Sequence, residues 1–152
     1  MKATDQFHVG IVVDDIPAAA AELTALFGYE WCTELGASAR VSLPGGDTVL
    51  DLTSTYSMTV PRLELVRSVP GTLWQPAADS GVHHLGYWSD DVAADSAELA
   101  RRGYVSEAVG RRPDSTPYWA FHRGPTGPRV ELVTRALQPV LEQYWANGRR
   151  PS

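Results

Sequence analysis

The sequence has little cysteine, no excess of basic charge and no long apolar run, and each absence excludes a class of protein. Cys32 is the only cysteine among 152 residues, so no disulfide can form within the chain, which is compatible with a reducing compartment. The formal net charge of −5 provides no positive field for nucleic acid. No segment approaches the roughly 20 apolar residues that span a membrane, and the N-terminus is unlike a signal peptide. We therefore expect a soluble, cytoplasmic protein that binds neither nucleic acid nor membrane.

Composition and length indicate a globular protein with one hydrophobic core. Hydrophobic residues make up 43% of the chain and charged residues 20%, which is ordinary for such proteins. A chain of 152 residues has the usual length of a single domain. We expect residues 1–152 to form one domain.

Two motifs occur twice, in the same order. FHVGIVVDD at residues 7–15 matches HHLGYWSDD at residues 83–91, with His8 on His84. PRLELVR then matches PRVELVTR, with Glu64 on Glu131. The repetition predicts a duplicated unit in which each copy supplies one His and one Glu.

Hydrophobic periodicity and turn residues predict the order β-α-β-β-β in each copy. Ala20, Leu23, Leu26 and Phe27 form one apolar stripe on the first helix, the face expected to pack. The predicted segments of the first module, 7–67, are strands at 7–13, 39–43, 48–53 and 61–67 and a helix at 17–27. Those of the second module, 83–135, are strands at 83–89, 104–109, 118–123 and 129–134 and a helix at 92–102. Residues 68–82 are expected to connect the modules, and 136–147 to form a C-terminal helix.

Strand alternation predicts that the repeated His and Glu side chains share one face of the sheet. Leu63, Leu65, Val130 and Leu132 point the other way and suit packing under the helices. A buried carboxylate needs a cation or a shifted pKa, and the cation could be the neighbouring Arg62 or Arg129. Two carboxylates and two imidazoles also suit a divalent first-row metal, and their joint recurrence favours a metal site.

The repeated motifs resemble the vicinal oxygen chelate superfamily, which includes glyoxalase I, methylmalonyl-CoA epimerase, bleomycin-resistance proteins and extradiol dioxygenases. The resemblance rests on HVGIVVDD with LELV and HHLGYWSDD with VELV, and covers residues 7 to about 134. It implies an α+β fold in which two βαβββ modules form an eight-stranded, incompletely closed cup around one divalent metal ion. By position it implies His8, Glu64, His84 and Glu131 as the ligands, whereas His83 should face the other way.

The ligand set is nearest to the glyoxalase and epimerase branch, which implies a metal-dependent isomerase, epimerase or lyase. The metal could be nickel, cobalt, zinc, manganese or iron, and Glu131 or Glu64 would move a proton next to the carbonyl of a small substrate. Trp88, Tyr118 and His122 are candidates for substrate contact. Alternatives are a non-catalytic protein that binds a small molecule or antibiotic, and an extradiol-type iron dioxygenase. We also expect a homodimer, in which the cup closes within one chain or across two.

Overall fold

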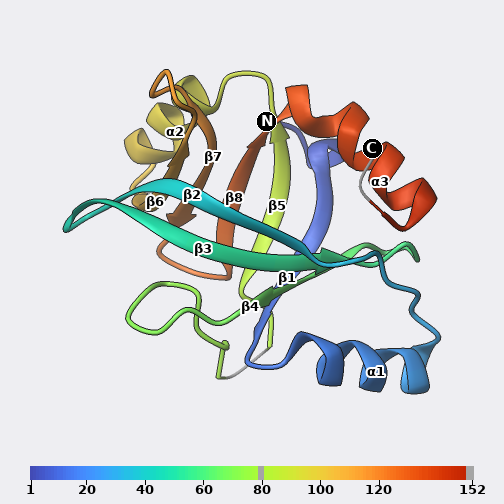
Figure 1. The fold of residues 1–152 in the computed structure, drawn as a ribbon. Helices are drawn as coiled ribbons and strands as arrows, with labels where there is room; N and C mark the ends of the chain where they lie inside the picture. Colours follow the sequence, from blue (N-terminus) through green and yellow to red (C-terminus); the bar gives the residue numbers. More distant parts are fainter. Residues whose placement is uncertain (79–80, 150–152) are drawn as a thin grey trace.

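The computed structural model describes residues 1–78 and 81–149, in which eight strands form a barrel (Figure 1). Residues 79–80 of the expected connector and residues 150–152 lie outside the described residues. The strands of the first half are β1 (Gln6–Val13), β2 (Leu35–Leu43), β3 (Gly46–Tyr56) and β4 (Leu63–Arg67). Those of the second half are β5 (His84–Ser89), β6 (Val105–Arg111), β7 (Pro117–Arg123) and β8 (Arg129–Thr134). The predicted β-α-β-β-β order is present in both halves.

The two halves have the same internal topology and meet along two seams. The strand order around the barrel is β1-β4-β3-β2-β6-β7-β8-β5. Within the halves, β1 pairs with β4 and β5 with β8, both in parallel. Across the seams, β1 pairs with β5 and β2 with β6, both antiparallel. Because β2 and β6 pair from Arg40 to Ser42, the wall is continuous within one chain, where an incompletely closed cup was expected.

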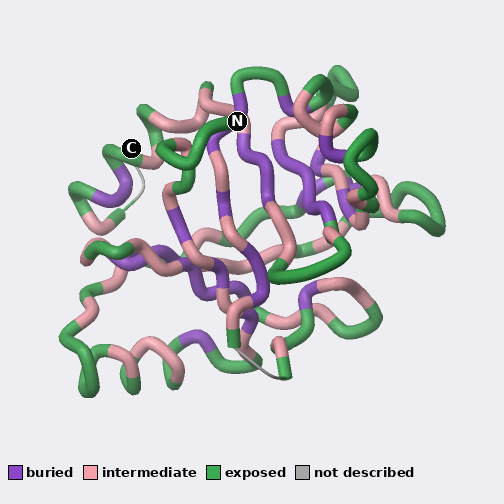
Figure 2. Tube along the Cα trace, turned by 180° about the vertical axis from the view of Figure 1, so that it is seen from behind, coloured by how far each residue is buried: buried purple, intermediate pink, exposed green. Residues whose placement is uncertain are grey.

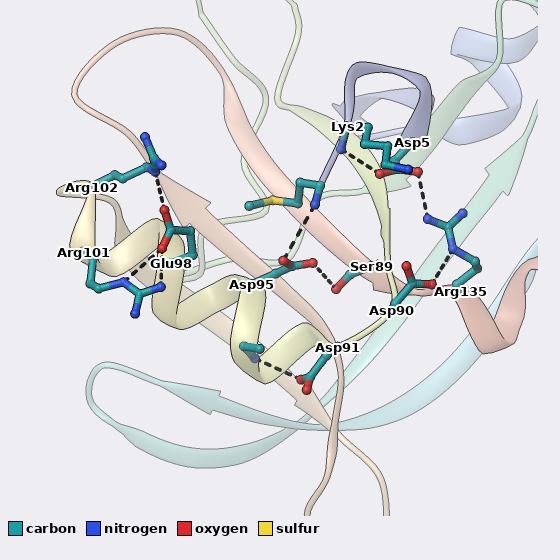
Figure 3. Close-up of polar contacts among 12 residues, drawn as sticks. Lys2, Asp5, Ser89, Asp90, Asp91, Asp95, Glu98, Arg101, Arg102 and Arg135 are labelled. Atoms are coloured by element: carbon teal, nitrogen blue, oxygen red, sulfur yellow. Dashed lines mark hydrogen bonds and ion pairs between the residues drawn. The ribbon is translucent and has the colours of Figure 1, made fainter.

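Matching caps begin the two helices of the repeat. The Asp15 side chain accepts a hydrogen bond from the Ala18 N–H at the start of α1 (Ile16–Phe27). Asp91 accepts one in the same way from Ala94 at the start of α2 (Val92–Arg101), as Figure 3 shows. Such caps satisfy a backbone donor that has no partner within the helix. Both predicted helices are confirmed, with ends that differ from the expected ones by one residue.

The two helices pack to different degrees. Val92 and Leu99 of α2 are buried against Ala120 and Leu132 of the barrel. In α1 only Ile16 is buried, and its remaining surface is half-buried or exposed (Figure 2). Leu26 and Phe27 of this helix are 64% and 69% exposed. The expectation that the whole apolar stripe packs is therefore wrong for the last turn of α1, because α1 meets the barrel chiefly through the short strand β4.

The C-terminal segment closes over the barrel. A 3-10 turn at Arg135–Leu137 leads into α3 (Gln138–Asn147), whose Tyr144 and Trp145 are buried in the main core. Figure 3 shows Arg135 paired with Asp5 before β1 and Asp90 after β5. No helix in the described part of the chain is long and apolar enough to cross a membrane.

Candidate metal centre

Strand register brings the four repeated ionisable residues together inside the barrel. In the antiparallel seam His8 lies opposite Gly86, and His84 lies opposite Gly10. The parallel pairs place Glu64 beside Gly10 and Glu131 beside Gly86. Four neighbouring strands, β4, β1, β5 and β8, therefore each direct one donor to the same place, as strand alternation predicted. The four side chains are His8, Glu64, His84 and Glu131.

The two glycines of the seam provide the space that the imidazole rings occupy. A Cβ atom on Gly10 would lie 1.9 Å from Cε1 of His84. A Cβ atom on Gly86 would lie 1.9 Å from Cε1 of His8. Each ring thus lies directly over the glycine on the facing strand, and no larger residue fits there. The H-x-G pattern of both copies was the sequence signal for this contact, although its role was not evident there.

The donor atoms have the mutual spacing of ligands around one ion. His8 Nε2 lies 3.0 Å from His84 Nε2, 3.2 Å from Glu131 Oε2 and 3.4 Å from Glu64 Oε2. His84 Nε2 lies 3.1 Å from Glu64 Oε2 and 3.5 Å from Glu131 Oε2. Metal–ligand bonds of about 2.0–2.2 Å place neighbouring ligand atoms about 3.0–3.5 Å apart. The four residues therefore fit a first-row divalent metal.

The neighbouring arginines do not neutralise the two carboxylates. Arg62 donates to the carbonyl oxygen of Ser57, and its guanidinium carbon lies 4.0 Å from the ring centre of Trp145. Arg129 pairs with Glu107. The alternative in which each arginine satisfies the nearby repeated Glu is thus excluded. The glutamates are each only 8% exposed and face the two imidazoles, so their charge must be balanced within the cluster.

A positive charge at the centre of the cluster is favoured. Burial by itself lowers the pKa of His8, but the adjacent Glu131 and Glu64 outweigh it and raise that pKa to about 9. Burial likewise acts to raise the pKa of Glu64, but His8 and His84 hold it well below its usual value. A proton on His8 Nε2 therefore lies close to His84 Nε2 and to one carboxylate oxygen of each glutamate. A metal ion with two positive charges would satisfy the same atoms more fully.

A cavity of about 210 Å³ opens beside the cluster. Its walls come from β2, β3, β4, β7 and β8, from the connector and from the C-terminal segment. Both carboxylates of the cluster line it. The other lining residues are Leu35, Ala37, Ala39, Leu52, Ser54, Tyr56, Val66, Trp74, Tyr118, Trp119, Phe121, Val133, Leu137 and Leu141. The centre is therefore accessible to a small molecule from one side.

The three residues proposed for substrate contact have different positions. Tyr118 lines the cavity. Trp88 is not among the lining residues, because its ring stacks on Phe7 in the core, with 3.8 Å between ring centroids. His122 lies on the face of β7 that carries Ala120, which packs under α2, and it is also not among the lining residues. Strand alternation could not determine which face of β7 points inward, and the inward face proved to be that of Trp119 and Phe121.

The family comparison agrees with this geometry. A model of the Glyoxalase/Bleomycin resistance protein/Dioxygenase superfamily matches residues 7–117. The chain belongs to this superfamily. An uncharacterized protein, YwbC from Bacillus subtilis (strain 168), is 25% identical over 130 residues, which are 84% of this chain and 95% of that one.

Solved structures of the same superfamily fold include methylmalonyl-CoA epimerases. A variant of the Streptomyces coelicolor epimerase, in complex with 2-nitronate-propionyl-CoA, has a TM-score of 0.58 and 20% identity. The comparison covers 87% of this chain and 97% of that one. The epimerase of Mycobacterium tuberculosis has a TM-score of 0.52 and 17% identity over 88% and 92% of the two chains. At these identities the likeness establishes the fold.

His83 contacts His84, one of the four clustered residues. Its Nε2 atom lies 2.8 Å from the carbonyl oxygen of Leu73, and its Nδ1 atom lies 2.9 Å from Nδ1 of His84. Burial lowers the pKa of His83 to about 4, so the ring is neutral. Since a carbonyl only accepts, His83 Nε2 carries the hydrogen and His84 Nδ1 must donate to His83 Nδ1. His84 Nε2 then offers a lone pair to the cluster, the form required of a metal ligand. His83 does lie outside the cluster, as expected, but this supporting role was not predicted.

Tyr56 makes the two halves of the centre unequal. It lies opposite Glu64 in the β3–β4 pair, where Phe121 lies opposite Glu131 in the β7–β8 pair. Burial, reinforced by the charges of both glutamates and a hydrogen bond to Glu64, raises the pKa of Tyr56 well above its usual value. Phe121 has no hydroxyl, so Glu131, whose Oε2 atom lies 3.2 Å from His8 Nε2, has no tyrosine partner of this kind. Tyr56 was missed because it lies outside both repeated motifs.

Proposed function

We propose that the protein binds one divalent metal ion through His8, Glu64, His84 and Glu131 and catalyses proton transfer next to the carbonyl group of a small substrate. This reaction class covers an isomerase, an epimerase or a lyase. The observation that carries the proposal is the buried set of two imidazoles and two carboxylates at ligand spacing, at the end of a cavity. Nickel, cobalt, zinc, manganese and iron all suit such a donor set.

The chemistry requires an electrophile and a base at the same place. A divalent metal bound there supplies a Lewis acid that polarises a carbonyl and makes the adjacent C–H more acidic. The cavity brings the substrate against the two carboxylates, and its apolar walls exclude water. The carboxylates are the groups able to accept a proton from carbon and return it.

The inequality of the two halves favours Glu131 over Glu64 as the group that transfers the proton. Glu64 has the Tyr56 hydroxyl as a hydrogen-bond partner besides the two imidazoles, whereas Phe121, at the matching place, offers no hydroxyl to Glu131. Glu131 can therefore turn toward a substrate at lower cost. Tyr56 keeps its proton at neutral pH and donates it to Glu64, so its hydroxyl oxygen can accept a hydrogen bond from a substrate hydroxyl in the cavity.

The superfamily relatives support this class of reaction without identifying the substrate. Epimerases invert a carbon centre, and removal and return of a proton is one means of doing so. The methylmalonyl-CoA epimerases share the fold at 17–20% identity. An acyl-CoA thioester is accordingly one candidate substrate class. The phosphate groups of its CoA part are negatively charged, and this charge decides how well it suits the cavity.

The proposal is tested by following hydrogen–deuterium exchange next to the carbonyl of a panel of ketones and thioesters in D2O by NMR. The zinc-, nickel- and manganese-loaded wild type should exchange at least one compound faster than the metal-free protein. Glu131→Gln should lose exchange by about 10²-fold or more, as for removal of a general base. Glu64→Gln, its matched variant in the other half, should retain more activity. Exchange that is equal with and without metal would contradict the proposal.

The aromatic cavity also suits a second function, a non-catalytic protein that binds a small molecule. Trp74, Trp119 and Phe121 provide the apolar walls that such a site needs. This function gives no reason for four buried ionisable ligands, which is why it stands second. Tight binding of a compound that is returned without exchange or conversion by the metal-loaded protein would favour it.

A further inference from the structure

We propose that the natural substrate is an uncharged, mainly apolar carbonyl compound of the size of a single aromatic ring with short substituents. This inference rests on the proposed function, because it names the substrate class of the same site. It departs from acyl-CoA esters and from carboxylate-bearing substrates. It is drawn from the charges and shapes of the residues around the cavity.

Most of the residues that line the cavity are apolar or aromatic. Aromatic rings of the connector and β7 form one wall, namely Trp74, Tyr118, Trp119 and Phe121. Small side chains on β2 and β3 lie among the other lining residues, namely Ala37, Ala39 and Ser54. A lining that combines aromatic rings with small side chains favours a flat, apolar group.

No arginine or lysine of the described chain lines the cavity, whose charged lining groups are Glu64 and Glu131. Two arginines on β8 and just after it are engaged elsewhere: Arg129 pairs with Glu107, and Arg135 bridges Asp5 and Asp90 (Figure 3). A carboxylate or phosphate entering the cavity would lose water and gain no cationic side chain in return.

A bound divalent metal does not reverse this balance. Two neutral imidazoles and two carboxylates around a doubly charged cation give a centre with no net charge. The whole chain has a formal net charge of −5, which repels anions at longer range. An uncharged substrate avoids both costs and gains from burial of its apolar surface.

The polar groups near the centre specify where the substrate has its oxygen. Tyr56 lines the cavity together with Glu64 and offers a hydroxyl group there. Ser54 supplies a second hydroxyl on the same strand, two residues away and so on the same face. The substrate should therefore present one or two uncharged carbonyl or hydroxyl oxygens to the metal centre and its apolar part to the aromatic wall.

The test uses two probes that differ in charge and have nearly the same shape. Acetylbenzoyl and benzoylformate share a phenyl ring and two adjacent carbonyl groups, and the methyl group of the first is an anionic oxygen in the second. Binding is followed by the fluorescence of the intact protein, since Trp74 and Trp119 line the cavity. Both the metal-free and the zinc-loaded protein are titrated. We expect acetylbenzoyl to bind about tenfold or more tightly than benzoylformate in both forms, and propionyl-CoA not to compete. Equal or tighter binding of benzoylformate in either form, or competition by propionyl-CoA, would overturn the inference.

A designed cation provides the matched control. Leu52 is half-buried and lines the cavity, so Leu52→Arg adds a cation there, while Leu52→Gln removes the same apolar group without charge. We expect only Leu52→Arg to improve benzoylformate binding, by about tenfold. No difference between the two variants would count against the inference. Failure of the proposed function is seen separately, as absence of zinc uptake by elemental analysis, and it leaves the comparison on the metal-free protein valid.

Discussion

Gly10 and Gly86 connect a simple sequence pattern to the geometry of the centre. Each lies under the imidazole of the facing strand, at a place where a Cβ atom would overlap the ring. Both antiparallel strands carry a His two residues before a Gly. The ring of each His therefore lies over the Gly of the other strand. The same arrangement holds the Nε2 atoms of His8 and His84 3.0 Å apart.

Substitution of these glycines should therefore disrupt metal binding. In Gly10→Ala and Gly86→Ala the added methyl group must displace His84 or His8, and we expect zinc affinity to fall by about 10–100-fold, as when ligand orientation is lost. Gly36→Ala is the matched control, because nothing lies within 4 Å of a Cβ atom there. Competition with a chromophoric chelator measures the affinities. Unchanged affinity in both seam variants would contradict the geometry.

The raised pKa of His8 predicts how metal uptake depends on pH. With a pKa of about 9, His8 carries a proton at pH 7 that a metal must displace. Zinc affinity should therefore rise as the pH increases from 7 toward 9, because less work is needed to remove this proton, and it should level off above pH 9. Titration calorimetry in buffers of different ionisation enthalpy should also detect a released proton at pH 7. Affinity that is constant across this range would show that His8 is already neutral.

The sequence predicted which four ionisable residues share a face, because alternation along a strand and repetition of the motifs are both local properties. It could not predict Tyr56 or His83. Their roles depend on the register of β3 against β4 and on the course of the connector past His83, and neither is encoded in a motif. Likewise the exclusion of Arg62 as a partner depends on its contact with Trp145 of α3.

At the scale of elements, the strands and helices were predicted well where periodicity and caps agree. Asp15 and Asp91 cap α1 and α2 as their positions indicated. The packing of α1 was not predictable from its apolar stripe, because a stripe shows only which face could be buried. Leu26 and Phe27 remain exposed since the barrel offers little surface under the last turn.

The aromatic packing between β1, β5 and α3 predicts a structural role for Trp88. Its ring packs on Phe7 and near Trp145, outside the cavity lining. Trp88→Ala should lower the free energy of unfolding by roughly 3–5 kcal/mol, as for other large core truncations, and leave metal stoichiometry unchanged. Chemical denaturation followed by circular dichroism measures the loss. Trp119→Ala is the control, because it enlarges the cavity and should alter probe binding. If Trp88→Ala changed the probe affinity of the folded protein, Trp88 would contact the substrate after all.

At the scale of the whole molecule, the barrel closes within one chain. The two seams join the halves, and all four donors of the centre come from the same polypeptide. Sequence repetition predicted two similar halves, but it could not decide between closure within one chain and closure across two. That choice depends on the long-range pairing of β2 with β6. The expected homodimer remains a prediction.

This closure predicts that metal content does not depend on association of chains. Zinc-loaded protein diluted through any dimer–monomer transition should retain one ion per chain, because no donor comes from a partner. Size-exclusion chromatography with light scattering and in-line elemental detection follows mass and metal together. Loss of metal that coincides with dissociation would show that a second chain completes the centre.

The most direct test of the account is the metal content of the purified, untagged protein, measured by elemental analysis after loading with zinc, nickel or manganese. We predict about one ion per chain in the wild type, and loss of it in His8→Ala and Glu131→Ala. His122→Asn, which changes another buried histidine outside the cluster, should retain it. Absence of metal uptake by the wild type, or full retention in both ligand variants, would contradict the central claim that these residues form a metal centre.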